Sequence, residues 1–158
     1  SLAWGRVFSV YGPHELPKRL VPSVTRGLLR GEPVACSNGR LVRDYLFVED
    51  VAEAFAAILD GDVRGPINIA SGKGVSMKDL VGRIETILNR KGLIRWGARD
   101  PSPGSPPRMV ADVRRLRSEV GWRPRHSLSD GLEATIRFWA EALGVSWTPR
   151  SGRRGGVV

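Results

Sequence analysis

Side chains capable of acid, base or metal chemistry are few and widely separated in this sequence. The two histidines, His14 and His126, have no carboxylate or thiol at ligand spacing, which argues against a metal site or a histidine-based catalytic triad. Neither Tyr11 nor Tyr45 is followed by lysine four positions later, because the residue at that spacing is glutamate in both cases. The chain therefore lacks a Tyr-x-x-x-Lys base of the reductase type.

A short glycine-containing segment could in principle bind phosphate. Gly72-Lys73-Gly74 lies between a predicted strand and a predicted helix, where backbone N–H groups at the helix start can hold an anion. Met77 stands where a third glycine would allow close helix packing, and no acidic residue follows at the end of a second strand to hold a ribose. We interpret this segment as a strand-to-helix turn.

The chain is strongly basic, and its composition is that of one globular unit. A net charge of +9 over 158 residues indicates an anionic partner, whether a diphosphate, a nucleic acid or an acidic surface. No apolar run is long enough to cross a bilayer. The single cysteine, Cys36, cannot form an internal disulfide, so we expect a reducing, cytoplasmic setting.

The elements that must position any site alternate between helix and short strand, which predicts an α/β fold without internal repeats. Apolar residues at helical spacing and capping residues mark the helices. Helices are predicted over 19–30, ended by Gly31; over 51–59, capped by Asp50; in a short helix capped by Asp112; and after the capping boxes Ser76/Asp79 and Ser127/Asp130.

Strand signals are strongest in three places. Residues 3–10 are apolar and β-prone, and the run from Ile67 to Ala70 is typical of a strand buried on both faces. The pair Asn38-Gly39 separates residues 33–36 from residues 41–48, which predicts two strands joined by a tight hairpin.

Five segments in a fixed order resemble the NAD-dependent epimerase/dehydratase family, also called the extended short-chain dehydrogenases. They cover roughly residues 3 to 140, and within the family they are most similar to the dTDP-glucose 4,6-dehydratase branch. The segments are Arg6-Val7-Phe8-Ser9-Val10-Tyr11-Gly12-Pro13, Pro17-Lys18-Arg19-Leu20-Val21-Pro22, Val42-Arg43-Asp44-Tyr45-Leu46-Phe47-Val48-Glu49-Asp50-Val51, Asn68-Ile69-Ala70-Ser71-Gly72 and Gly121-Trp122-Arg123-Pro124.

Arg43 is the best single candidate for a substrate contact. A nucleotide sugar carries a diphosphate, and the planar guanidinium of Arg43 can offer two parallel donors to it, which lysine cannot. The alternative is a structural ion pair between Arg43 and Asp44 or Asp50. The resemblance also implies nucleotide contacts at Arg19 and Leu20 and base contacts at Pro33, Val34 and Ala35, although these residues could equally be helix surface and strand core.

The resemblance implies three further contacts. Asn68 matches a residue that hydrogen-bonds substrate in the dehydratases, and a structural hydrogen bond is the equal alternative. Ser9 stands where many members carry asparagine and can still donate a hydrogen bond. The turn Tyr11-Gly12-Pro13 is expected near the nicotinamide and the sugar.

One segment departs from the dehydratase pattern. Where that branch has Arg and His in an Arg-Pro-Gly-His stretch, this chain has Ser102-Pro103-Gly104-Ser105, so two cationic donors are lost. Arg99 and Arg108 are candidates to replace them. The departure puts dTDP-glucose in doubt as the substrate.

The resemblance implies the C-terminal part of a Rossmann-type parallel sheet plus a small α/β substrate-binding domain. We expect residues 1–147 to form this portion and residues 148–158 a flexible basic tail. The intact enzyme would use NAD or NADP, bind a nucleotide-diphosphate sugar and form a homodimer. The Gly-rich cofactor loop and the catalytic pair are not in this sequence, so we expect the chain alone to be inactive and to bind the cofactor poorly.

Two alternatives come from other classes of protein. A basic nucleic-acid-binding module would explain the charge, but the arginines are not interleaved with aromatic residues. A non-catalytic interaction module would use an exposed sheet edge.

Overall fold

The computed structural model describes residues 2–100 and 104–149, so most of the predicted basic tail and part of the Ser102-Ser105 segment lie outside the described residues. The described chain is a mixed α/β structure with parallel strand pairs. The strands are β1 (Ala3–Val7), β2 (Ser9–Tyr11), β3 (Val34–Cys36), β4 (Val42–Arg43), β5 (Tyr45–Phe47), β6 (Gly65–Ile69), β7 (Val75–Ser76), β8 (Ile94–Trp96) and β9 (Arg108–Met109). The helices are α1 (Leu20–Arg30), α2 (Val48–Leu59), α3 (Met77–Leu88), α4 (Arg114–Ser118) and α5 (Leu128–Ala142).

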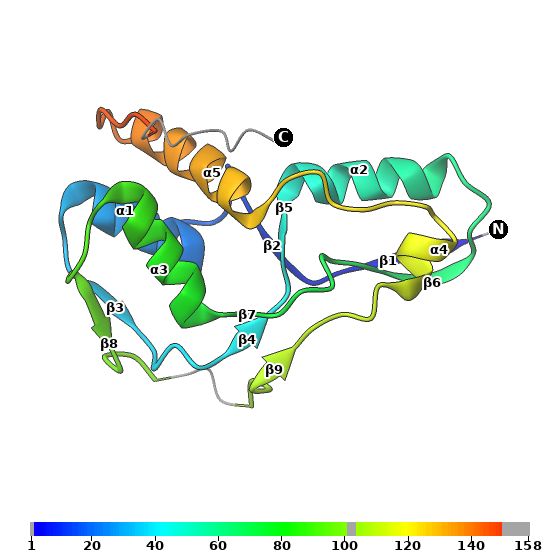
Figure 1. Ribbon diagram of the computed structural model, residues 1–158, viewed down its shortest axis with the longest axis horizontal. Helices are drawn as coiled ribbons and strands as arrows, with labels where there is room; N and C mark the ends of the chain where they lie inside the picture. The colour runs from blue at the N-terminus through cyan, green and yellow to red at the C-terminus, as the bar shows by residue number, and fades with distance from the viewer. Residues whose placement is uncertain (1, 101–103, 150–158) are drawn as a thin grey trace, which may run out of the picture.

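The two ends of the molecule have separate hydrophobic cores (Figure 1). At one end β1 and β6 pair in parallel and pack against α2 and α4, around Ile67, Ile69 and Leu116. Along β6 these two isoleucines are fully buried, whereas Pro66 is exposed and Asn68 is half-buried. The prediction of a strand buried on both faces is therefore wrong, because one face of β6 meets the core and the other is only partly covered.

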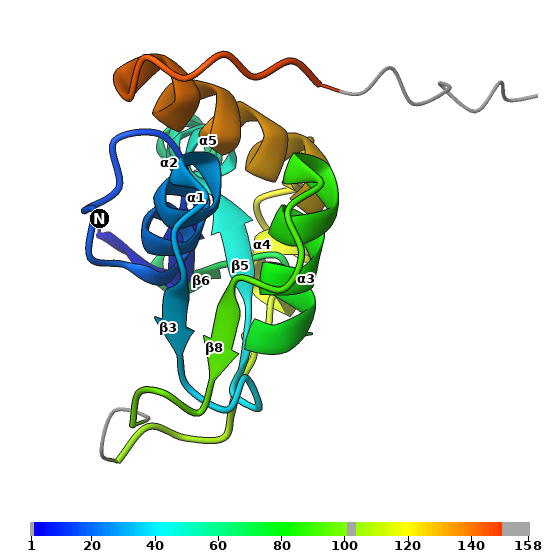
Figure 2. The same ribbon diagram turned by 90° about the vertical axis from the view of Figure 1, so that its left-hand side faces the viewer.

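At the other end α1 packs against β3, which pairs in parallel with β8, and the helices α3 and α5 pack against α1 (Figure 2). The helices α1, α3 and α5 bury Leu28, Ile84 and Ile136 against one another. Gly31 ends α1 with φ of 71°, a left-handed conformation that glycine adopts without a side-chain clash. The predicted helix over 19–30 is thus confirmed, as is the Ser127/Asp130 capping box that starts α5.

The predicted hairpin around Asn38-Gly39 is wrong. Strand β3 pairs with β8, whereas β4 pairs with β7 and β9, and β5 pairs in parallel with β2. The turn residues are present, but the chain on either side finds partners far away in the sequence. Tertiary pairing overrides the local turn signal.

Two of the helix caps predicted from the sequence are not formed as predicted. The residue before α2 is Phe47, and Asp50 lies inside the first turn without capping it. Asp112 does accept a hydrogen bond from the N–H of Arg114, although Val113 occupies the cap position of α4. Ser76 caps α3 through its hydroxyl, but the Asp79 carboxylate accepts from that hydroxyl and not from the Ser76 N–H, so only half of the predicted capping box forms.

Asp44 joins three parts of the chain between the two cores. Its carboxylate is fully buried and accepts hydrogen bonds from the N–H and hydroxyl of Ser71 at 2.8 and 2.6 Å, from the N–H of Gly72 at 2.9 Å and from the N–H of Ala111 at 3.2 Å. A buried carboxylate is stable only when its oxygens are compensated in this way. Asp44 therefore fixes the segment after β6 and the segment before α4 against the junction of β4 and β5.

Replacing Asp44 with asparagine should lower the free energy of unfolding by about 3 kcal/mol. The new amide would present its own N–H groups to the N–H groups of Gly72 and Ala111, leaving buried donors facing donors. Urea unfolding of Asp44→Asn beside Asp62→Asn, a matched change at an exposed position, measures the difference. Equal unfolding midpoints for the two variants would contradict this account of Asp44.

Candidate functional site

The phenol of Tyr45 in β5 is largely buried, and charged side chains act on it electrostatically. Burial raises the pKa of Tyr45 to about 12, and the positive charge of Arg43 acts against this shift. The carboxylate of Glu15 raises the pKa further, while Arg19 lowers it. Four side chains from β4, β5 and the segment before α1 thus lie close enough to act on one another.

The Arg43 guanidinium is held by backbone carbonyls. Its Nη1 atom donates to the carbonyl oxygens of Val42 at 2.8 Å and Pro106 at 2.9 Å. Among the described residues, no carboxylate lies within ion-pair distance of Arg43, so the predicted ion pair with Asp44 or Asp50 is wrong. The oxygens of those two aspartates instead accept hydrogen bonds from other segments. Arg43 therefore keeps its full positive charge in a fixed position.

The start of α1 adds a second feature favourable to an anion. Arg19 is the cap residue, it makes no side-chain hydrogen bond to the helix, and the first turn contains no acidic residue. The positive end of the helix is therefore not neutralised from within its first turn. Arg19 itself is exposed and makes a 3.4 Å ion pair with Glu15, which holds its guanidinium beside this helix end.

An apolar cavity opens next to α1. Leu20, Val34 and Ala35, three of the residues predicted to contact nucleotide, line a cavity of about 190 Å³. Lys18, Arg99 and Asp100 are its charged lining residues. Pro33 lies in an adjoining, more open cavity of about 470 Å³, which shares Val34, Ala35 and Arg99. The structure thus brings the predicted base-contacting strand and the start of α1 together.

The remaining predicted substrate residues lie apart from this cavity. Ser9 pairs with Tyr45 across the β2 and β5 strands, so its position is beside the Tyr45 phenol site. Asn68 lies in β6 and donates from its side-chain amide to the carbonyl of Asp112 at 2.9 Å. The structural hydrogen bond weighed for Asn68 is therefore present.

The predicted cofactor turn is closely packed. The hydroxyl of Tyr11 donates to the carbonyl of Leu128 at 3.2 Å, and burial raises the pKa of this phenol. At Gly12 a side chain would place its Cβ 2.5 Å from Cγ1 of Val48, so the residue allows close approach of two segments. Pro13 continues this turn.

The described residues do not form a dinucleotide cradle. The Gly72-containing loop presents N–H groups, but those of Ser71 and Gly72 already donate to the Asp44 carboxylate. A phosphate there would face a negative charge at close range. Its interpretation as a structural turn is confirmed, and the residues present do not suit an NAD pyrophosphate.

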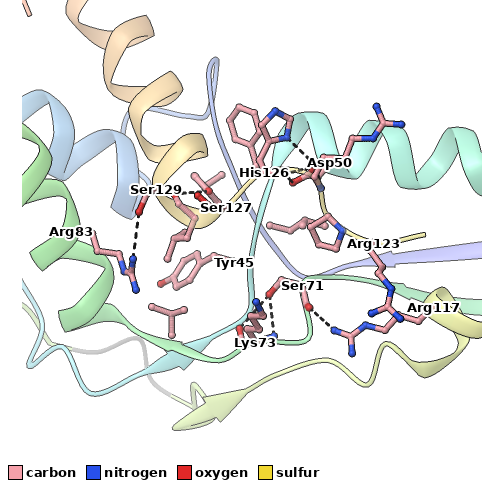
Figure 3. Close-up of a pocket in the computed structure, with 17 residues that line it drawn as sticks. Tyr45, Asp50, Ser71, Lys73, Arg83, Arg117, Arg123, His126, Ser127 and Ser129 are labelled. Carbon is pink, nitrogen blue, oxygen red and sulfur yellow. Dashed lines mark hydrogen bonds and ion pairs between the residues drawn. The ribbon is translucent and has the colours of Figure 1, made fainter. Parts of the chain in front are cut away.

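A second buried aspartate orders the residues beside His126. Asp50 is fully buried and accepts hydrogen bonds from the N–H groups of Arg125 and His126, and its Oδ1 lies 3.0 Å from His126 Nδ1 (Figure 3). The hydrogen bond to Asp50 raises the pKa of His126, and the nearby charges of Asp50, Glu49 and Glu53 add to this shift. No group of three or more potential metal ligands occurs in the described residues. None of the helices described has the length and apolar character needed to span a bilayer.

Sequence reasoning missed several residues of the site. Tyr45 lacks a lysine partner and is not predicted from the sequence, yet it lies two residues after Arg43 in extended chain and therefore on the same side. That spacing was a usable signal. Lys18 and Met77 reach the α1 cavity from separate segments, which no local pattern indicates, and Arg99 also lines this cavity.

Comparisons with known proteins relate the chain to one family. Residues 1–70 match the model of the NAD dependent epimerase/dehydratase family. The chain is 30% identical over 139 residues to a dTDP-glucose 4,6-dehydratase of Xanthomonas campestris, covering 82% of this chain and 40% of that protein. Neither match supports a nucleic-acid-binding module.

Two solved structures share the fold. The UDP-glucose 4-epimerase of Thermotoga maritima, solved with UDP-glucose, superposes with a TM-score of 0.83 and 28% identity over 89% of this chain and 46% of its own. The UDP-glucuronic acid 4-epimerase of Bacillus cereus was solved with UDP-glucuronic acid and NAD. It superposes with a TM-score of 0.80 and 25% identity, over 87% of this chain and 45% of its own. The chain thus spans less than half the length of these proteins.

The Asp50–His126 pair predicts a pH-dependent stability. Because the folded state raises the pKa of His126, its stabilising contribution is complete below the unfolded value of about 6.5 and is lost as the pH rises through the folded value. Unfolding of the wild type and of His126→Gln should therefore differ most at about pH 6, and the difference should shrink towards about pH 9. A difference that stayed constant over this range would contradict the assignment.

Proposed function

The chain belongs to the NAD-dependent epimerase/dehydratase family, and on this basis we propose that it is the nucleotide-sugar-binding part of such an enzyme. The observations that carry the proposal are the Arg43 guanidinium, which the carbonyls of Val42 and Pro106 hold in place, and the start of α1, whose first turn contains no acidic residue. A guanidinium and a helix N-terminus suit a diphosphate, which carries two adjacent negative charges.

We propose a division of this site between the parts of the ligand. The diphosphate lies between Arg43 and Arg19. The nucleoside enters the α1 cavity, where Leu20, Val34 and Ala35 offer an apolar surface and Arg99 a cation at the rim. The sugar extends towards Ser9, whose hydroxyl can donate to it. The UDP-sugar complexes of the two similar epimerases support this ligand class.

The cofactor in this proposal is NAD, held by residues other than those that the structure describes. The support is that the glycine loop is closed by Asp44 and that a similar epimerase was solved with NAD. When bound, NAD would accept a hydride from the sugar and return it. The chain's own residues would bind and orient the nucleotide sugar, and we propose that they perform no catalysis alone.

The exposed face of β1 supports the proposed domain division. Strand β1 pairs with β6 along one edge, and no strand among the described residues pairs with its other edge. Leu2, Trp4 and Leu59 at this end are large, apolar and exposed. We propose that β1 and β6 belong to the last part of a Rossmann sheet, within residues 1–147, and that the intact enzyme is a cytoplasmic homodimer.

Replacing Arg43 with lysine should weaken binding of UDP-glucose about tenfold, because lysine cannot make two parallel bonds to a diphosphate. Isothermal titration of the purified chain measures the dissociation constant. Arg137→Lys, a matched change on the exposed face of α5, should leave the constant unchanged. The proposal fails if wild-type protein does not bind UDP-glucose or if Arg43→Lys binds it equally well.

The purified chain, supplied with NAD and UDP-glucose, should form no product. The sequence contains no Tyr-x-x-x-Lys pair, and both tyrosine hydroxyls have raised pKa values that disfavour the phenolate form. Chromatography of the nucleotide sugars after prolonged incubation provides the measurement. Formation of UDP-galactose or a dehydrated sugar would contradict the proposed loss of catalysis.

A further inference from the structure

A second cavity, which we call the cationic pocket, lies between the start of α5, strand β5 and the segment after β6 (Figure 3). Its volume is about 540 Å³, within the usual range for small-molecule sites. None of the eight residues predicted to contact a nucleotide sugar lines it. The pocket is therefore a different cavity from the α1 cavity, although Tyr45, and Tyr11 of the predicted cofactor turn, both line it.

Besides Arg125, which pairs with Glu53, four cations from four segments of the chain line this pocket. Arg83 comes from α3 on one side, and Arg117 of α4 and Arg123 lie on the opposite side. Lys73, in the loop after β6, lies between them. The first and last of these cations, Lys73 and Arg123, are 50 residues apart in the sequence. The fold therefore brings them together.

These four cations have no acidic partner among the described residues. Other arginines of this surface do, because Arg114 pairs with Asp112, Arg115 with Glu119, and Arg125 with Glu53. Asp50 is the acidic residue that lines the pocket, and its oxygens accept hydrogen bonds from the N–H of Arg125 and from His126. The pocket therefore carries a strong positive charge that the protein itself does not balance.

Neutral contacts orient two of the guanidiniums. Arg117 Nη2 donates to the carbonyl of Ser71 at 3.1 Å, and Arg83 Nη1 lies 3.5 Å from the hydroxyl of Ser129. Ser71 is itself fixed by Asp44. These contacts position the cations without cancelling their charge, which leaves their other N–H groups for an anion.

The start of α5 and an apolar wall complete the pocket. Ser127, Leu128 and Ser129 at the start of α5 line it, and the first turn of this helix is capped by Ser127 and Asp130. Asp130, the partner in the capping box, is not among the lining residues. Tyr45, Phe47 and Val75 provide apolar surface beside the cations, which a simple inorganic ion would not use.

We propose that the cationic pocket binds a phosphorylated small molecule, with its phosphate or diphosphate among Lys73, Arg117 and Arg123 and its organic part against Tyr45 and Phe47. Arginine suits phosphate because its N–H groups pair with two oxygens at once. The ring of Tyr45 borders this pocket, while its phenol responds to the charges of Arg43 and Arg19. The protein thus has two anion sites that share one tyrosine.

Titration with inorganic pyrophosphate at low ionic strength tests the proposal. The wild type should bind it, and the double variant Lys73→Gln/Arg123→Gln should bind it about tenfold more weakly. The matched control Lys91→Gln/Arg137→Gln changes two exposed cations outside the pocket and should have no effect. All four substitutions are at exposed residues, and unfolding curves will show whether each variant is folded.

Amide chemical shifts locate the bound ion. Pyrophosphate should shift the amides of residues 71–75 and 127–129 in the wild type, and Arg43→Lys should leave these shifts unchanged. Absence of binding, equal affinity in the Lys73/Arg123 variant, or loss of binding only in Arg43→Lys would overturn the proposal. Those results would not bear on the proposed nucleotide-sugar site. That site is tested separately, by measuring UDP-glucose binding to the Lys73→Gln/Arg123→Gln variant.

Phenyl phosphate tests the organic part of the ligand. Its ring can lie on the apolar wall, so it should bind about threefold more tightly than inorganic phosphate. Equal affinity for the two probes would contradict an organic ligand at Tyr45 and Phe47.

Discussion

Asp44 lies at the junction of β4 and β5 without solvent exposure, and its oxygens accept hydrogen bonds from Ser71, Gly72 and Ala111. A carboxylate cannot remain charged in such a place unless its partners stay with it. The loop after β6 and the segment before α4 are therefore tied to β4 and β5. Asp50 ties the residues around His126 to the start of α2 in the same manner. Two carboxylates of one motif thus hold segments that are distant in the sequence.

The position of Asp44 also determines where charge is available for a ligand. Side chains of extended chain alternate, so an inward Asp44 places Arg43 and Tyr45 towards the other side. Backbone carbonyls fix the Arg43 guanidinium in place, and no carboxylate among the described residues pairs with it. The N–H groups of Ser71 and Gly72 are committed to Asp44, so they cannot hold a phosphate as the backbone of a cofactor loop does. Any anion near this loop must therefore be held by side chains.

The sequence predicted features whose causes are local and missed those whose causes are not. The helix ended by Gly31 and the capping box at Ser127 depend on neighbouring residues, so periodicity and caps identify them. The hairpin at Asn38-Gly39 was wrong because its strands pair with distant segments. Arg43 could be predicted from its motif, but its lack of an ion pair could not. The cationic pocket draws on four separate segments, and only the fold brings them together.

The central claim is that Arg43, the start of α1 and strand β3 form one nucleotide-sugar site. A map of backbone amide chemical shifts during titration of the chain with UDP-glucose tests it most directly. We predict that the largest changes fall at residues 19–21, 34–36 and 43–45, while residues 71–74 change little. Changes confined to other segments, or none at saturating ligand, would contradict the claim.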